Sequence, residues 1–199
     1  ASSPPATGGY IPPGMPGHSP GIGLPYDPDG ARQLQAEAGY PGGSGYPVID
    51  SLAGVGGSPL QNTYLQEQRR DVLGVEIRWE LVELTRFLDV LDWEPPRMFR
   101  AMWIADYPDP DSFLRGCVRH RTRWRDEVYD GSVAAAWGAL DQEKRLKLYH
   151  QADRILVEEA PVVPLLYGCW HALLKPWVRK MPTSPMAVWH YKDFILDPH

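Results

Sequence analysis

Apolar residues recur every three or four positions in several stretches of the chain, which is the spacing that places them on one side of an α-helix. This spacing predicts four helices, over residues 28–38, 60–73, 84–93 and 141–159. The first has Asp27 as its N-cap and Pro28 in its first turn, and Gly39 can adopt the left-handed conformation that ends it. Pro95 and Pro161 follow the third and fourth helices and stop them.

A second pattern, in which every other side chain is apolar, runs through residues 75–82 and is typical of a half-buried β-strand. Apolar runs predict further strands over residues 46–55, 97–105, 162–166 and 170–174. The stretch 112–140 is expected to be loop and short helix. Because strands and helices alternate, the pattern favours an α/β domain with a mixed sheet.

The first 25 residues carry almost no charge and show neither pattern. Proline removes a hydrogen-bond donor and glycine loosens the backbone, so we expect extended loop here. Of the 19 glycines and 21 prolines, more than half of each lie in the first 60 residues. The chain begins Ala-Ser-Ser without an initiator Met or a leader, and we therefore expect it to be a piece of a longer protein.

Bulk composition excludes some classes of partner. The net charge is −5, which gives no reason to expect nucleic acid as a partner. The longest apolar stretch, residues 160–174, is too short to span a membrane and is interrupted by Pro164 and His171. Cys117 and Cys169 either form one disulfide or remain thiols, and the sequence leaves both open.

No motif for metal, nucleotide or nucleophilic catalysis emerges. The six histidines are interpreted as solvated or core residues rather than metal ligands, and no Gly-rich loop precedes a Lys-Ser/Thr helix start. Cys169 and His171 are expected on one face of a strand, but nothing nearby would orient the histidine as a base. The arginines between Arg115 and Arg125 are interpreted as a solvated face. We therefore expect no cofactor and no metal.

The segment RAMWIADYPDPDSFL, residues 100–114, is the strongest candidate for a binding site. It places Arg100, Trp103, Asp106 and Tyr107 at the end of a predicted strand, and ligands usually bind at such ends in open α/β sheets. An Asp there can accept hydrogen bonds from a ligand ammonium, with the two aromatic side chains as walls. An Asp-Pro turn with aromatic side chains packed in the core explains the same residues equally well.

Five blocks together resemble a known family. They are YDPDGARQLQAEAGYPGG (26–43), LGVEIRWELVE (73–83), WIADYPDPDSFL (103–114), LYHQADRILVEEAPVVPLLYG (148–168) and LLKPWV (173–178). In this order they resemble the C-terminal part of the family-five extracellular solute-binding proteins, which are the peptide-, dipeptide- and nickel-binding receptors of bacterial ABC importers.

The resemblance implies an α/β, mixed-sheet lobe of a type II periplasmic-binding-protein-like clamshell. Residues 26–175 would form the second lobe, after a Gly/Pro-rich extended segment at 1–25. Residues 176–199 would return toward the first lobe, whose bulk is absent from this chain. In peptide-binding members, the Asp at the position of Asp106 pairs with the peptide ammonium, and the Arg at the position of Arg100 helps meet a peptide carboxylate in some members. Trp103 and Tyr107 would line the cleft.

Two hypotheses follow for the function. The first is a binding module and not an enzyme: the lobe of a periplasmic or lipoprotein-anchored receptor that binds peptides or similar small solutes. Its partners would be the solute, the missing first lobe and an ABC-importer permease, with no nucleic acid. The second is a lobe of the same kind used as a sensor or interaction module without transport. A hydrolase has the least support, because no triad or carboxylate pair emerges.

Overall fold

The computed structural model describes residues 3–54, 58–118, 121–169, 171–182 and 190–198. These residues form two compact units. Unit 1 combines residues 1–24 with 103–199, and unit 2 comprises residues 25–102. The expected organisation into 1–25, 26–175 and 176–199 concerns the lobes of a longer protein and stays a prediction.

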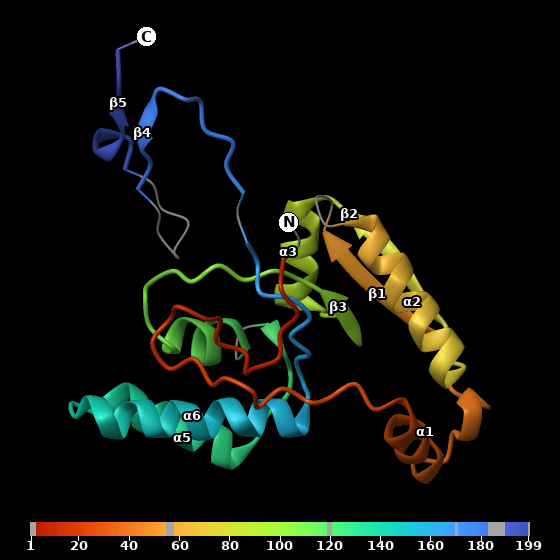
Figure 1. The fold of residues 1–199 in the computed structure, drawn as a ribbon. Helices are drawn as coiled ribbons and strands as arrows, with labels where there is room; N and C mark the ends of the chain where they lie inside the picture. Colours follow the sequence, from red (N-terminus) through yellow and green to blue (C-terminus); the bar gives the residue numbers. More distant parts are fainter. Residues whose placement is uncertain (1–2, 55–57, 119–120, 170, 183–189, 199) are drawn as a thin grey trace. The chain divides into compact units, whose positions relative to one another are not determined.

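Unit 2 is built on a parallel sheet of three strands in the order β2-β1-β3. The strands are β1 (Ile49–Gly54), β2 (Ile77–Val82) and β3 (Met98–Arg100). The helices are α1 (Pro28–Glu37), α2 (Pro59–Leu73) and α3 (Leu84–Trp93), with a 3₁₀ turn at Pro41–Gly43. Helix α2 connects β1 to β2, and α3 connects β2 to β3, which is the crossover that parallel strands require (Figure 1).

Residues at the helix ends of unit 2 determine where its helices begin and end. The side chain of Asp27 accepts a hydrogen bond from the Gly30 backbone N–H and caps α1, as predicted. Helix α2 ends at Gly74, whose φ of 66° lies in the left-handed region. The small core beneath the sheet consists of buried aliphatic and aromatic side chains, namely Leu52, Val82, Phe87 and Leu91. The expected alternation in β2 fails at its end, because Leu81 is exposed and Val82 is buried.

Unit 1 is helical. It contains a π-helical segment at Ser112–Val118, helix α5 (Glu127–Gly138) and helix α6 (Gln142–Glu159), and α5 and α6 pack against each other. Tyr149, Ala152 and Leu156 of α6 are buried, as the predicted stripe requires. The C-terminal part adds an antiparallel pair, β4 (Val178–Lys180) and β5 (Ile195–Leu196), and a 3₁₀ turn at Tyr191–Asp193.

The N-terminal segment forms no helix or strand in its described residues, but it is part of the core of unit 1. Ile11 is fully buried and Met15 nearly so, both against α5 and α6 residues of the same cluster. The Tyr167 hydroxyl accepts a hydrogen bond from the Gly8 N–H and donates one to the Gly9 carbonyl. Apolar packing and backbone hydrogen bonds therefore hold this loop in place.

Several expectations for unit 1 were wrong. Helix α5 has 12 residues, where only loop and short helix were expected. Residues 162–166 form no strand: Leu166 makes a single antiparallel bridge with Pro5. Of the predicted strand 170–174, the described residues 171–174 are not strand, and Trp170 lies outside the described residues. An apolar run becomes a strand only where a partner edge supplies hydrogen bonds, and here one bridge is all that forms.

The α/β class expected from the sequence is confirmed, with parallel pairing in the three-stranded sheet and antiparallel pairing in the β4-β5 pair. The strand expected over 97–105 is reduced to Met98–Arg100. Cys117 is buried, Cys169 is exposed, and both are free thiols. Among the described residues, no helix combines the length and the apolar character that a membrane span needs.

Candidate functional site

The candidate residues from the sequence fall into both units. Arg100 ends strand β3 in unit 2, whereas Trp103, Asp106 and Tyr107 belong to the loop that opens the second segment of unit 1. That loop runs to Ser112, where the π-helical segment begins.

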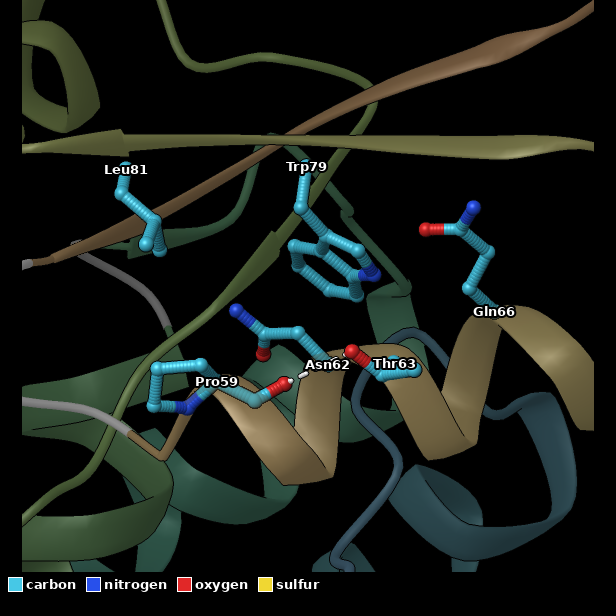
Figure 2. Close-up of a pocket in the computed structure, with 6 residues that line it drawn as sticks. All are labelled: Pro59, Asn62, Thr63, Gln66, Trp79 and Leu81. Carbon is cyan, nitrogen blue, oxygen red and sulfur yellow. Dashed lines mark hydrogen bonds between the residues drawn. The ribbon is translucent and has the colours of Figure 1, made fainter.

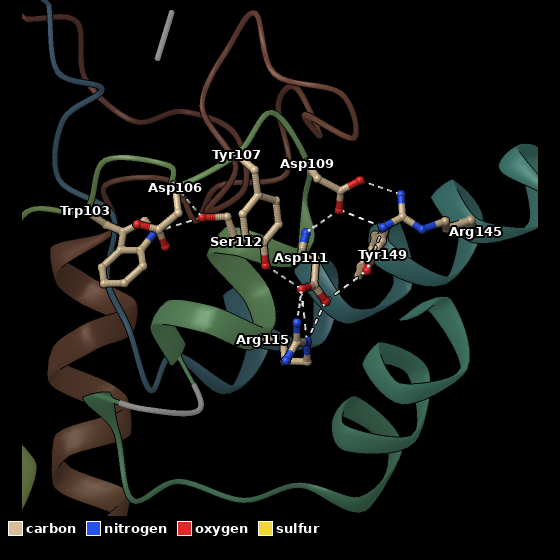
Figure 3. Close-up of polar contacts among 9 residues, drawn as sticks. All are labelled: Trp103, Asp106, Tyr107, Asp109, Asp111, Ser112, Arg115, Arg145 and Tyr149. Atoms are coloured by element: carbon tan, nitrogen blue, oxygen red, sulfur yellow. Dashed lines mark hydrogen bonds and ion pairs between the residues drawn. The ribbon is translucent and has the colours of Figure 1, made fainter. Parts of the chain in front are cut away.

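Asp106 presents its side chain to solvent from the loop. Its carboxylate has no hydrogen bond or ion pair with any residue that the structure describes, while its backbone N–H donates to the Ser112 Oγ at 3.0 Å. The indole Nε1–H of Trp103 donates to the same oxygen at 3.4 Å (Figure 3). Ser112 thus brings Trp103 and Asp106 together.

The aromatic ring of Tyr107 is partly exposed, whereas its hydroxyl is already hydrogen-bonded. Its side chain is about 37% exposed, and its phenol O–H donates to Asp111 Oδ2 at 2.7 Å. Burial and the hydrogen bond to this carboxylate raise the pKa of the phenol. The side chain can therefore offer an aromatic surface to a ligand, but its hydroxyl is already engaged.

Asp111 is the buried centre of this polar network. It is fully buried and accepts hydrogen bonds from Tyr107, from the Arg115 guanidinium (2.5 to 2.9 Å) and from the Tyr149 hydroxyl at 3.1 Å. Burial alone raises the pKa of the Asp111 carboxyl, but the hydrogen bonds from Arg115 and Tyr107 outweigh it and lower the pKa below its usual range. The carboxyl is therefore ionised and paired at neutral pH.

A second ion pair ties the same loop to helix α6. The guanidinium of Arg145 binds both oxygens of Asp109, at 2.6 and 2.7 Å. Asp109 Oδ1 also accepts the backbone N–H of Asp111 at 2.9 Å, and Arg145 lies over the ring of Tyr149 (Figure 3). A bidentate arginine pair fixes orientation as well as distance. Two arginine–aspartate pairs, Arg115–Asp111 and Arg145–Asp109, thus tie this loop to the helical segments of unit 1.

This support was not predicted from the sequence. Arg115 was expected on a solvated face, which was wrong: it pairs with a fully buried carboxylate, and its guanidinium lies 4.1 Å from the centre of the Trp137 ring. Arg125 donates to the backbone carbonyls of Thr122 and Trp124, and Arg119 lies outside the described residues. The i,i+4 spacing of Asp111 and Arg115 is a helix-pair signal that could have shown the first contact.

Arg100 in unit 2 is partly buried and is held by two neutral amides. Its Nε donates to Asn62 Oδ1 at 2.6 Å and its Nη1 to Gln61 Oε1 at 2.9 Å. Burial lowers the pKa of the guanidinium, which remains charged, and neither amide neutralises that charge. The orientation of Arg100 is therefore fixed while its charge stays uncompensated by these partners.

Asn62 also lines a pocket of about 180 Å³ between α2 and β2, with Pro59, Thr63, Gln66, Trp79 and Leu81. Figure 2 shows Trp79 and Leu81 extending from the strand toward the helix that carries Asn62 and Thr63. The lining is neutral, and the Trp79 Nε1 is buried without a hydrogen-bond partner among the described residues. Nowhere in the described residues do three or more His, Cys, Asp or Glu side chains gather as a metal site.

Comparison with known proteins gives a consistent result. The sequence model for the middle region of the bacterial extracellular solute-binding proteins of family 5 matches residues 2–123. Di/tripeptide-binding protein 2 of Pseudomonas aeruginosa is 29% identical over 203 residues, covering 97% of this chain and 38% of that protein. Dipeptide-binding protein DppE of Bacillus subtilis is 30% identical over 107 residues, covering 52% of this chain and 20% of that protein.

A solved structure shows the same fold. The dipeptide-binding protein of Pseudoalteromonas sp. SM9913, in complex with Met-Leu, aligns with a TM-score of 0.78 at 19% identity and covers 98% of this chain. The alignment spans 40% of that structure. The chain therefore spans about two fifths or less of the length of these relatives.

Proposed function

The chain belongs to the bacterial extracellular solute-binding proteins of family 5, and from this membership we propose that it is the ligand-binding C-terminal lobe of a receptor for peptides or similar small solutes. The receptor delivers its solute to an ABC-importer permease and requires a first lobe that this chain does not contain. The family is one of binding proteins, and we propose that this chain likewise binds its solute without transforming it.

The exposed carboxylate of Asp106, which pairs with none of the described residues, is the observation that carries the proposal. The carboxylates of Asp109 and Asp111 are bound by Arg145 and Arg115, so they have no charge left for a ligand. Asp106 differs from both because none of the described residues pairs with it. A ligand ammonium supplies the cation that this position lacks, and a desolvated charge pair of this kind is strong and directional.

The neighbouring side chains suit the rest of a small peptide. Trp103 and the ring of Tyr107 provide apolar surface beside Asp106, and such surface binds aliphatic and aromatic ligand groups. Arg100 belongs to unit 2, where neutral amides bind its guanidinium among the described residues, and its role toward a ligand carboxylate is a separate part of the proposal. The four residues expected from the sequence thus retain their proposed roles.

Binding would be coupled to closure of the two lobes of the full-length receptor. A ligand that touches both lobes favours the closed state over the open one by the free energy of those additional contacts. One lobe alone forfeits that burial, so this chain by itself should bind a peptide no more tightly than about 1 mM. We place the receptor in the periplasm or at the cell surface, with a lipoprotein anchor.

The test is isothermal titration calorimetry on the full-length protein that contains this chain. A dipeptide with a free N-terminus should bind, and its N-acetylated form should bind about 30-fold to 1000-fold more weakly, since 2–4 kcal/mol is typical of losing one partner of a desolvated charge pair. Asp106→Asn should remove most of this discrimination. Asp89→Asn, an exposed carboxylate on α3, is the matched control and should leave it intact. Equal affinity for both peptides would refute the role of Asp106.

A further inference from the structure

One buried hydroxyl supports two of the side chains assigned to the ligand. Ser112 is fully buried, and its Oγ accepts the backbone N–H of Asp106 at 3.0 Å and the indole N–H of Trp103 at 3.4 Å. Figure 3 shows both donors converging on this single oxygen. The two residues belong to a loop without helix or strand, so the serine replaces the support that a regular element would otherwise supply.

Ser112 is itself anchored in the core. It begins the π-helical segment, its own backbone N–H donates to the Asp109 carbonyl at 3.2 Å, and its neighbours Asp111 and Phe113 are buried. Asp106, in contrast, is exposed. The hydrogen bonds to Ser112 therefore connect a solvent-facing carboxylate and its aromatic neighbour to a fixed point inside unit 1.

Burial also decides what kind of role Ser112 can have. A fully buried hydroxyl does not reach a solute at the surface, so any effect on binding must pass through Asp106 and Trp103. Holding a binding group in its bound geometry before the ligand arrives reduces the entropy lost on binding. A neutral hydrogen bond is worth about 1 kcal/mol, which corresponds to an effect of about 3-fold to 10-fold on affinity.

We propose that Ser112 is a positioning residue for ligand recognition, which sets the geometry of Asp106 and Trp103 before the solute binds. The proposal rests on the function proposed above, because it needs Asp106 to contact the ligand. In this proposal Ser112 affects affinity although it is buried and does not contact the ligand itself.

A double-mutant cycle in the full-length protein tests the proposal. The dissociation constant of a dipeptide with a free N-terminus is measured by calorimetry for wild type, S112A, D106N and S112A/D106N. We expect S112A to weaken binding about 3-fold to 10-fold in the wild-type background. In the D106N background, the same substitution should cost about 2-fold or less, which is the part that acts through Trp103.

Additional variants separate positioning from general loss of structure. S112C keeps nearly the same volume with a weaker acceptor and should weaken binding as S112A does, whereas S112T restores the hydroxyl and should recover affinity. Ser132→Ala is the control, since Ser132 is also buried but its hydroxyl donates to the Val128 carbonyl within α5. It should leave the dissociation constant unchanged.

The outcomes are distinguishable. Wild-type affinity in S112A and S112C, alongside a large loss in D106N, overturns the role of Ser112 and leaves the proposed function standing. An S112A effect of the same size in both backgrounds also overturns it, because the serine would then act on the whole unit rather than through Asp106. Wild-type affinity in D106N overturns both the proposed function and the positioning role that rests on it.

Discussion

Replacement of Asp111 by Asn tests whether the buried network beneath the loop is a source of stability. Asp111→Asn keeps the size of the side chain but removes the charge, so the Arg115 guanidinium loses its anionic partner. An amide also turns one acceptor into a donor, which then faces the hydroxyl or guanidinium donors that the carboxylate had bound. The substitution therefore weakens several hydrogen bonds at once.

The magnitude follows from the burial of the two partners. Asp111 is fully buried, and hydrogen bonds to a charged group contribute about 1.5–3 kcal/mol. The Arg115 side chain is 32% exposed, so water can recover part of its solvation and the cost stays below that of a fully buried pair. We expect a loss of about 3 kcal/mol in the free energy of unfolding, which lowers the urea midpoint by about 1–1.5 M at an m-value of about 2–3 kcal/mol/M.

The contribution of the Asp111 carboxylate to stability depends on pH. The folded-state pKa of Asp111 lies below its unfolded value of about 3.9, so its stabilisation is fully present above about pH 5. That stabilisation is lost as the pH falls through the folded pKa. The difference in the free energy of unfolding between wild type and Asp111→Asn should therefore be constant from pH 5 to 7 and shrink below about pH 4.

Urea unfolding followed by circular dichroism at several pH values measures both effects, with Asp89→Asn as the control for loss of an exposed carboxylate. A midpoint shift below about 0.3 M at pH 7 would refute the reasoning, because a buried charged acceptor of three side chains cannot be that dispensable. A difference that persists undiminished at pH 3 would show that charge is not its cause.

Two further predictions concern the core of unit 1. A Cβ at Gly9 would lie 1.8 Å from Asp153 Oδ2, and the Tyr10 N–H holds this buried carboxylate in place. Gly9→Ala should therefore lower the free energy of unfolding in urea by about 2–3 kcal/mol. An unchanged urea midpoint would contradict the contact. Burial raises the pKa of the Cys117 thiol, so Ellman's reagent should modify Cys169 in the native protein and Cys117 only after denaturation. Equal rates of modification of the two thiols in the native protein would show that Cys117 is accessible.

The helix predictions that succeeded rest on signals within a few residues. The Asp27 cap, the positive φ of Gly39 and the limits of Leu84–Trp93 were predicted from the sequence, because caps and prolines act on the backbone beside them. The predictions that failed needed partners far along the chain. Residues 162–166 have a strand-like composition, yet in the structure their pairing is limited to one bridge with Pro5.

In the candidate site, too, local features were predicted and contacts between distant residues were not. Residue types and family resemblance identified Arg100, Trp103, Asp106 and Tyr107 without any knowledge of contacts. The supporting residues could not be found in this way, because Arg145 lies 36 positions from Asp109 and Tyr149 lies 38 from Asp111. An ion pair between such distant residues has no local signature.

By itself, the amino-acid sequence determined the α/β class, most helix limits, the family and an acidic-aromatic loop at 103–107. Only the tertiary structure showed that arginines already bind Asp109 and Asp111, whereas the exposed carboxylate of Asp106 pairs with none of the described residues. It also placed the uncharged N-terminal segment in the core of unit 1, where Ile11 is fully buried. The physical reason is range: backbone preferences act over a few residues, whereas burial and ion pairing depend on groups that meet only when the chain folds.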